Sequence, residues 1–144
     1  MSFVKIWIHA VWTVKNREPI LDQDIRKILF EHIHKNAIEK EIFMDTVGGY
    51  NNHVHCLFRL RNSQSVDNVM QLIKGESSFW FNKSELSGLK LTWQKEYFAV
   101  SVSESNVEKV RSYIQNQEEH HKKKTWDDEY NEFITKYGFQ VIKG

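Results

Sequence analysis

Two histidines separated by a single residue are the first feature of this 144-residue sequence that could do chemistry. They lie in residues 52–60, which read NHVHCLFRL. Side chains two apart share one face of a β-strand, so His53 and His55 project together with Arg59, while the intervening apolar residues face the core. Imidazole is a common ligand of divalent metal ions. The spacing fits a metal site, and it fits the solvated polar face of a half-buried strand equally well.

A tyrosine and a glutamine one helical turn apart form a second candidate pair. Tyr113 and Gln117 are four residues apart on a predicted helix, so they lie on the same side of it. They fall on the shoulder of the apolar stripe that Val107, Val110 and Ile114 form. From this shoulder the tyrosine ring can pack while its hydroxyl reaches past the sheet. Considered alone, Tyr113 is typical of a packing tyrosine and Gln117 of a surface glutamine.

The hydrophobic pattern predicts the elements that position these side chains. Alternating apolar residues predict strands over residues 4–14, 42–47, 54–60 and 97–102. Helical spacing and capping residues predict helices that begin after Asp22, Ser65, Ser103 or Ser105, and Thr125, the last of which ends at Gly138. The order fits an α+β fold, a ferredoxin-like antiparallel sheet with helices packed on one face. We expect one domain over residues 1–144.

Composition limits the class of protein. Cys56 is the only cysteine, which excludes a four-cysteine zinc site and an intramolecular disulfide and is compatible with a cytoplasmic location. The sequence has no apolar run of twenty residues and no secretory leader, so no membrane span is expected. The net charge of +1 speaks against a generic electrostatic nucleic-acid binder. However, residues 1–124 carry +3 and residues 125–144 carry −2, so basic charge is available locally.

The two motifs together resemble those of a known family. A His53-Val54-His55 strand followed by a Tyr113-x-x-x-Gln117 helix is similar to the single-tyrosine HUH transposases of bacterial insertion sequences, the IS-two-hundred-like group. HUH denotes two histidines around a hydrophobic residue. The resemblance covers nearly the whole chain, including residues 15–17, 72–78 and 93–98. Asn52 departs from the pattern, because many relatives carry aspartate at that position.

The resemblance implies a metal-dependent DNA transposase that cleaves and rejoins single-stranded DNA at hairpin ends through a 5′-phosphotyrosine intermediate. Tyr113 would be the nucleophile, and His53, His55 and Gln117 would bind a Mg²⁺ or Mn²⁺ ion. A phenol has a pKa near 10, so its attack needs help, which charge neutralisation on the phosphate supplies. The resemblance also implies a homodimer, in which the tyrosine helix of one subunit can complete the histidine site of the other.

Several further residues are candidates for contacts with DNA or with the histidines. His9, on the polar face of the first strand, is expected to have a structural or supporting role. Trp93 and Tyr97 could stack on unpaired bases, although aromatic residues are more often part of the core. The candidates for binding DNA phosphates are the basic residues Lys15, Arg17, Arg59, Arg61, Lys74, Lys122 and Lys123.

Two other functions fit part of this pattern. A single-stranded nucleic-acid-binding module derived from such a transposase would use the same sheet without cutting DNA. A metal hydrolase acting on a small phosphate substrate would need only the histidines and would leave Tyr113 without a role. Formation of a covalent protein–DNA adduct distinguishes the transposase from both.

Overall fold

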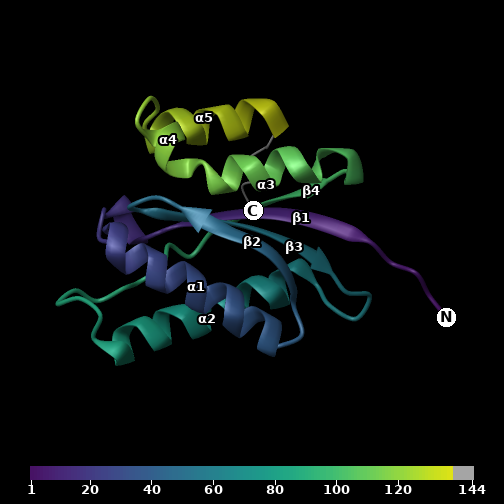
Figure 1. The fold of residues 1–144 in the computed structure, drawn as a ribbon, viewed down its shortest axis with the longest axis horizontal. Coiled ribbons are helices and arrows are strands. Elements are labelled where there is room, and N and C mark those ends of the chain that lie inside the picture. The colour runs from purple at the N-terminus through teal and green to yellow at the C-terminus, as the bar shows by residue number, and fades with distance from the viewer. Residues whose placement is uncertain (138–144) are drawn as a thin grey trace, which may run out of the picture.

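A four-stranded antiparallel sheet forms the centre of the computed structural model, which describes residues 1–137 (Figure 1). The strands are β1 (Ile6–Thr13), β2 (Phe43–Gly49), β3 (His53–Leu60) and β4 (Phe98–Val102), in the order β2-β3-β1-β4. The histidine strand β3 is therefore central. Its register with β1 places His55 opposite Val11 and His53 opposite Thr13.

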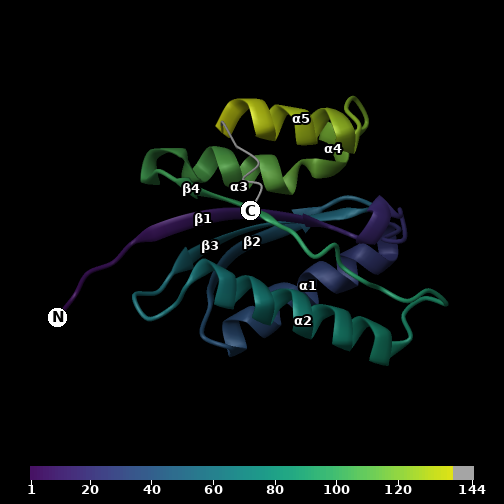
Figure 2. The same cartoon turned by 180° about the vertical axis from the view of Figure 1, so that it is seen from behind.

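Helices cover both faces of this sheet. Helices α1 (Gln23–Glu39) and α2 (Val66–Ser84) lie on one face, and α3 (Val107–Gln115), α4 (Gln117–His121) and α5 (Trp126–Tyr137) lie on the other, as Figures 1 and 2 show. Two short 3₁₀ turns, η1 (Lys15–Arg17) and η2 (Glu104–Asn106), complete the described elements. The α+β class and the antiparallel sheet are confirmed. The placement of the helices on one face is corrected, since it holds only for α1 and α2.

Apolar residues on the histidine face explain this correction. Val11 of β1 packs with Trp126 and Phe133 of α5, and Leu57 of β3 packs with Val107 and Ile114 of α3. Burying a large apolar side chain contributes roughly 1.5–3 kcal/mol, so these helices are more stable on the sheet than in water. The larger core lies on the opposite face, between the sheet and helices α1 and α2.

Three of the four predicted helix starts follow their capping residues. The exception is α3, which begins after Asn106 without a side-chain cap, so the cap predicted at Ser103 or Ser105 is wrong. The side chain of Asp22 accepts a hydrogen bond from the backbone N–H of Ile25 at the start of α1, and Ser65 accepts one from Asn68 at the start of α2. Thr125 and Asp128 form the reciprocal bonds of a capping box before α5. Gly138, the predicted end of this helix, lies outside the described residues. Within residues 1–137, no helix is both long and apolar enough to cross a membrane.

Candidate active site

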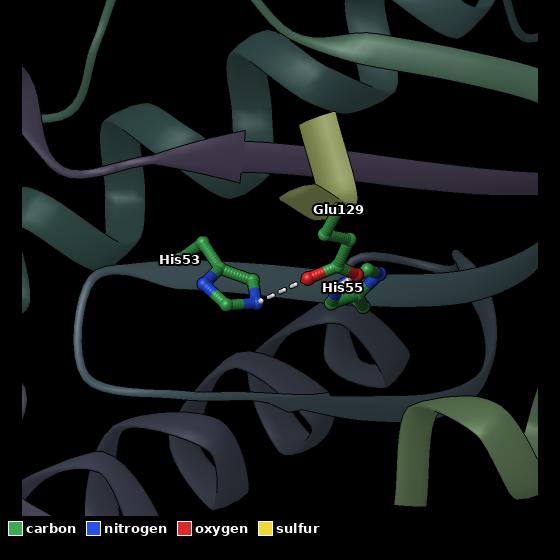
Figure 3. Close-up of side chains that lie close together, drawn as sticks. All are labelled: His53, His55 and Glu129. Atoms are coloured by element: carbon green, nitrogen blue, oxygen red, sulfur yellow. Dashed lines mark ion pairs between the residues drawn. The ribbon is translucent and has the colours of Figure 1, made fainter. Parts of the chain in front are cut away.

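The two histidines of β3 are fully buried. His53 and His55 each have a relative exposure of 0%. Of the two alternatives for this strand, the solvated face is therefore wrong, because α3, α4 and α5 cover it. Figure 3 shows both imidazoles beside Glu129, which comes from α5.

Gln117 and Tyr113 join the histidines from α4 and α3. Gln117 Oε1 lies 3.0 Å from His53 Nε2, and the Tyr113 ring centroid lies 5.5 Å from that of His55. Gln117 Nε2 also donates a hydrogen bond to the backbone oxygen of Tyr113, at 3.3 Å. The structure thus brings all four residues of the two sequence motifs into one cluster within one chain.

Glu129 lies at the centre of this cluster, and the sequence did not predict it as a site residue. Its carboxylate is fully buried and accepts a hydrogen bond from the Tyr113 hydroxyl. Its Oε2 lies 2.5 Å from His121 Nε2, and its Oε1 lies 2.9 Å from His55 Nε2. A signal was present: Glu129 is three residues after Trp126 and four before Phe133, so it stands on the apolar face of α5.

His121 was also missed as part of the site. The sequence places it in a basic run at the end of a helix, a position typical of solvated charge. In the structure its Nε2 reaches Gln117 Oε1 at 3.1 Å and its ring stacks on Tyr50.

Two neighbours fix the orientation of the histidines. His9 Nε2 and His55 Nδ1 share a hydrogen bond of 2.9 Å, which agrees with the supporting role expected for His9. Asn52 Oδ1 accepts a hydrogen bond of 2.8 Å from His53 Nδ1. The Asn52 side-chain NH₂ group also donates a hydrogen bond to the backbone oxygen of Arg17. This bond orients the amide so that its oxygen faces His53. Asn52 is thus a hydrogen-bond acceptor for the histidine, as an aspartate in its place would be.

The protonation of His53 leaves a lone pair directed into the cluster. Burial, with a smaller effect of His55, lowers the pKa of His53 to about 3, so its ring is neutral at pH 7. Its one proton lies on Nδ1, because an amide oxygen can only accept. The lone pair on Nε2 then faces two oxygens, Gln117 Oε1 at 3.0 Å and Glu129 Oε2 at 3.5 Å. Three acceptors this close together call for a cation between them.

The spacing of these atoms fits a divalent metal ion. Ligands bound at roughly 2.0–2.2 Å with octahedral or tetrahedral angles lie roughly 3.0–3.5 Å from one another. The separations in the cluster are 3.0, 3.5 and 2.9 Å. In addition, His55 Nε2 is buried and has no hydrogen-bond partner among residues 1–137, although Glu129 Oε1 lies 2.9 Å away. Two imidazoles, an amide oxygen and a carboxylate are ligands suited to Mn²⁺ or Zn²⁺, and in part to Mg²⁺.

The nucleophile candidate is held as a neutral phenol. Burial, followed by the negative charge of Glu129, raises the pKa of Tyr113 well above its usual range. For Glu129, burial alone would raise the carboxyl pKa, but the imidazoles of His121 and His55 outweigh burial and hold that pKa below its usual range. The cluster therefore contains an ionised carboxylate beside a protonated tyrosine.

Most of the basic candidates for DNA contact have partners in the structure. Arg17 pairs with Asp127 of α5, Lys122 pairs with Glu119, and Lys74 Nζ donates to the backbone oxygens of residues 94 and 95 at 2.7 and 2.9 Å. The remaining four lie elsewhere on the surface: Arg59 over the rings of Trp7 and Phe43, Arg61 bonded to the Glu41 oxygen, and Lys15 and Lys123 exposed.

An aromatic groove opens next to the cluster. It encloses about 1070 Å³ between β1, β4 and α5. The residues that line it include Arg17, Tyr97, Phe98, Trp126 and Tyr130. Trp126 connects the two sites, because its ring also lies 4.6 Å from that of His53. Trp93, the other aromatic candidate, is buried in the core and donates a hydrogen bond to Ser77.

Comparison with known proteins finds relatives in sequence and in fold. The chain is 25% identical over 115 residues to the ISDra2 transposase TnpA of Deinococcus radiodurans, covering 76% of this chain and 81% of that protein. A crystal structure described as a transposase from Deinococcus radiodurans matches with a TM-score of 0.64 at 20% identity, over 81% of this chain and 93% of that one. The structure of a REP-associated tyrosine transposase bound to a REP hairpin matches with a TM-score of 0.62 at 17% identity, over 84% of this chain and 72% of that one.

The family model for IS200-like transposases matches residues 2–117. This range includes the histidine strand, Tyr113 and Gln117, and it ends before α5 begins. The match spans most of the chain and every residue of the two motifs. The chain therefore belongs to the IS200-like transposase family.

Proposed function

We propose that this transposase cleaves and rejoins single-stranded DNA at hairpin ends through a covalent bond between Tyr113 and a 5′ phosphate. A Mg²⁺ or Mn²⁺ ion would be held by His53, His55 and Gln117. One observation carries the proposal: the Tyr113 hydroxyl and three side chains suited to metal binding meet in a single cluster, although the histidine motif and the tyrosine motif lie far apart in the sequence.

The chemistry follows from the side chains present. When bound, the ion would withdraw negative charge from the non-bridging oxygens of the scissile phosphate. Tyr113 Oη would form a bond to phosphorus while the bond from phosphorus to the 3′ oxygen breaks. The phenol gives up one proton and the released 3′ oxygen takes one, so protons balance. The phosphotyrosine ester retains the energy of the broken bond, so a 3′-OH can attack it and rejoin the strand.

DNA must displace α5 before this reaction begins. His53, His55 and Glu129 have no exposed surface, and Glu129 accepts a hydrogen bond from the Tyr113 hydroxyl. The adjacent groove suits unpaired nucleotides, because its tyrosine and tryptophan rings can stack on bases while Arg17 binds a phosphate. One structural relative is bound to a REP hairpin, which supports a hairpin as the substrate.

The test is a covalent adduct. A labelled single-stranded hairpin incubated with Mn²⁺ should yield a protein–DNA species that survives a denaturing gel. Tyr113→Phe should abolish this species, whereas Tyr130→Phe, which removes a hydroxyl from a groove tyrosine, should retain it. An adduct that persists in Tyr113→Phe would refute the assignment of the nucleophile.

The second candidate function is a single-stranded nucleic-acid-binding module that does not cut. The complete burial of the cluster favours it, because a sealed site can persist in a protein that only binds. In the same assay this module would bind the hairpin and form no adduct with Mg²⁺, Mn²⁺ or Zn²⁺.

The homodimer is a further part of the proposal. Within one chain, Ile114 of α3 packs beside Leu57 of β3, so each subunit positions Tyr113 against its own histidines. A dimer of such subunits has two complete sites, and mixing Tyr113→Phe with His53→Ala subunits should restore no adduct. Restored adduct would instead demonstrate that the tyrosine helices are exchanged between subunits.

A further inference from the structure

We infer that Glu129 is a fourth ligand of the metal ion in the DNA-free protein, supplied by a helix that lies outside the family match. This inference rests on the proposed function, since it concerns the ion that His53, His55 and Gln117 would bind. It adds a carboxylate to the two imidazoles and the amide, and it gives α5 a role in the site.

Geometry is the first argument. One nitrogen from each β3 histidine and one Glu129 oxygen all lie within 4.8 Å of one another. Glu129 Oε1 lies 2.9 Å from His55 Nε2, and the other carboxylate oxygen, Oε2, lies 3.5 Å from His53 Nε2. Both match the separation of neighbouring ligands around one ion, roughly 3.0–3.5 Å.

Charge is the second argument. Glu129 is the only buried acidic side chain among residues 1–136, and no lysine or arginine bonded to its carboxylate is found there. An ionised carboxylate without a cationic partner is costly to bury. A divalent ion would supply the positive charge and would also satisfy His55 Nε2, which has no hydrogen-bond partner in the described chain.

The position of α5 is the third argument. Trp126 and Phe133 lie one helical turn before and one turn after Glu129, and both pack against Val11 of β1. This packing fixes the Glu129 carboxylate over the histidines. A ligand on α5 would also stabilise this closed position. Movement of α5 away from the sheet would remove Glu129 from the histidines and open the site to the scissile phosphate.

The first experiment measures metal affinity without DNA. Chelator-treated protein is titrated with Mn²⁺, and free Mn²⁺ is followed by its electron paramagnetic resonance signal. Glu129→Gln should weaken Mn²⁺ binding at least ~10-fold, as even indirect partners of metal ligands do. Glu132→Gln is the matched control: it changes an exposed glutamate of the same helix, which pairs with Lys124, and should bind as the wild type does.

Failure of the inference is distinguishable from failure of the proposed function. If Glu129→Gln binds Mn²⁺ as tightly as the wild type while His53→Ala does not, Glu129 is no ligand but the histidine site stands. If His53→Ala also binds normally, the metal site itself is refuted.

A second measurement requires no variant. Hydrogen exchange of the amides of α5 (Trp126–Tyr137) should slow when Mn²⁺ is added to the wild-type protein, because a ligand on this helix links it to the sheet. Exchange in α2, on the opposite face, should not change. Exchange of α5 that is the same with and without Mn²⁺ would overturn the inference, even if Glu129→Gln proved unstable.

Discussion

Replacement of Gly48 by alanine should impair catalysis through the position of α3. Gly48 lies in β2 opposite His55, where the backbone of α3 at Ile114 lies close against the sheet. A Cβ at this position would lie 2.6 Å from the backbone oxygen of Ile114 and 2.9 Å from its Cγ2. Ordinary contact begins at 3.4 Å, so α3 must retreat by about 0.8 Å. Tyr113 and Gln117 would retreat with it.

The expected magnitudes follow from this displacement. Overpacking of this kind costs about 1–3 kcal/mol of stability, and a misplacement of about 1 Å at reacting groups costs on the order of 100-fold in rate. We therefore expect Gly48→Ala to fold, to unfold at lower urea concentration, and to form the covalent hairpin adduct about 100-fold more slowly.

Gly75→Ala is the matched control. Gly75 lies within α2, and a Cβ there would meet no atom within 4 Å. Alanine should raise stability by about 0.5–1 kcal/mol through helix propensity and leave the adduct rate unchanged. If Gly48→Ala forms adduct at the wild-type rate, the close approach of α3 does not position the tyrosine and the reasoning fails.

Three further predictions concern the surroundings of the site. In metal-free protein, lowering the pH from 7 to 5 should reduce the free energy of unfolding by roughly 2 kcal/mol for each of His9 and His53. The reason is that a histidine in the unfolded chain takes up a proton near pH 6.5, whereas these two folded rings have pKa values of about 3 and remain neutral. Urea unfolding at the two pH values measures this loss, and equal stability would contradict the prediction. Glu129 does not contribute to the loss, because its lowered pKa affects stability only below the unfolded value of 4.5. Asn52→Ala should weaken Mn²⁺ binding about 10-fold while Asn52→Asp retains it, as calorimetric titration would show, because only the aspartate keeps an acceptor for His53 Nδ1. Lys74→Met should lower stability by about 1–3 kcal/mol, measured by thermal unfolding, because the Lys74 ammonium donates hydrogen bonds to the backbone oxygens of residues 94, 95 and 96. An unchanged unfolding temperature would refute this role.

Local signals in the sequence predicted much of the fold. Alternation at two-residue spacing located the central strands, and Asp22, Ser65 and Thr125 marked helix starts that the structure confirms. These features depend on neighbours a few residues apart, so the sequence displays them directly. The second helical layer was not predicted, because the polar residues of β3 made that face resemble a solvated one. Val11 and Leu57 on the same face are the apolar residues that attract helices there.

The candidate site was predicted in part for the same reason. His53, His55, Tyr113 and Gln117 belong to short motifs, and the structure brings them together. Glu129 belongs to no motif, and its role depends on how α5 docks on the sheet. Docking is set by long-range packing of Trp126 and Phe133, which a local pattern does not specify. Their spacing predicted that α5 is amphipathic but not which surface it covers.

The pairing of Arg17 with Asp127 has a consequence for the thermodynamics of DNA binding. An arginine that is free in solution releases bound counterions from DNA when it contacts a phosphate, and each such contact steepens the dependence of affinity on salt. If Arg17 binds a DNA phosphate as proposed, it would exchange one anionic partner for another, and the Asp127 carboxylate that it leaves would bind cations from solution. The salt dependence of hairpin binding should therefore be shallower than the number of basic contacts implies. Removing the acidic groups of α5 should make it steeper while increasing affinity at low salt.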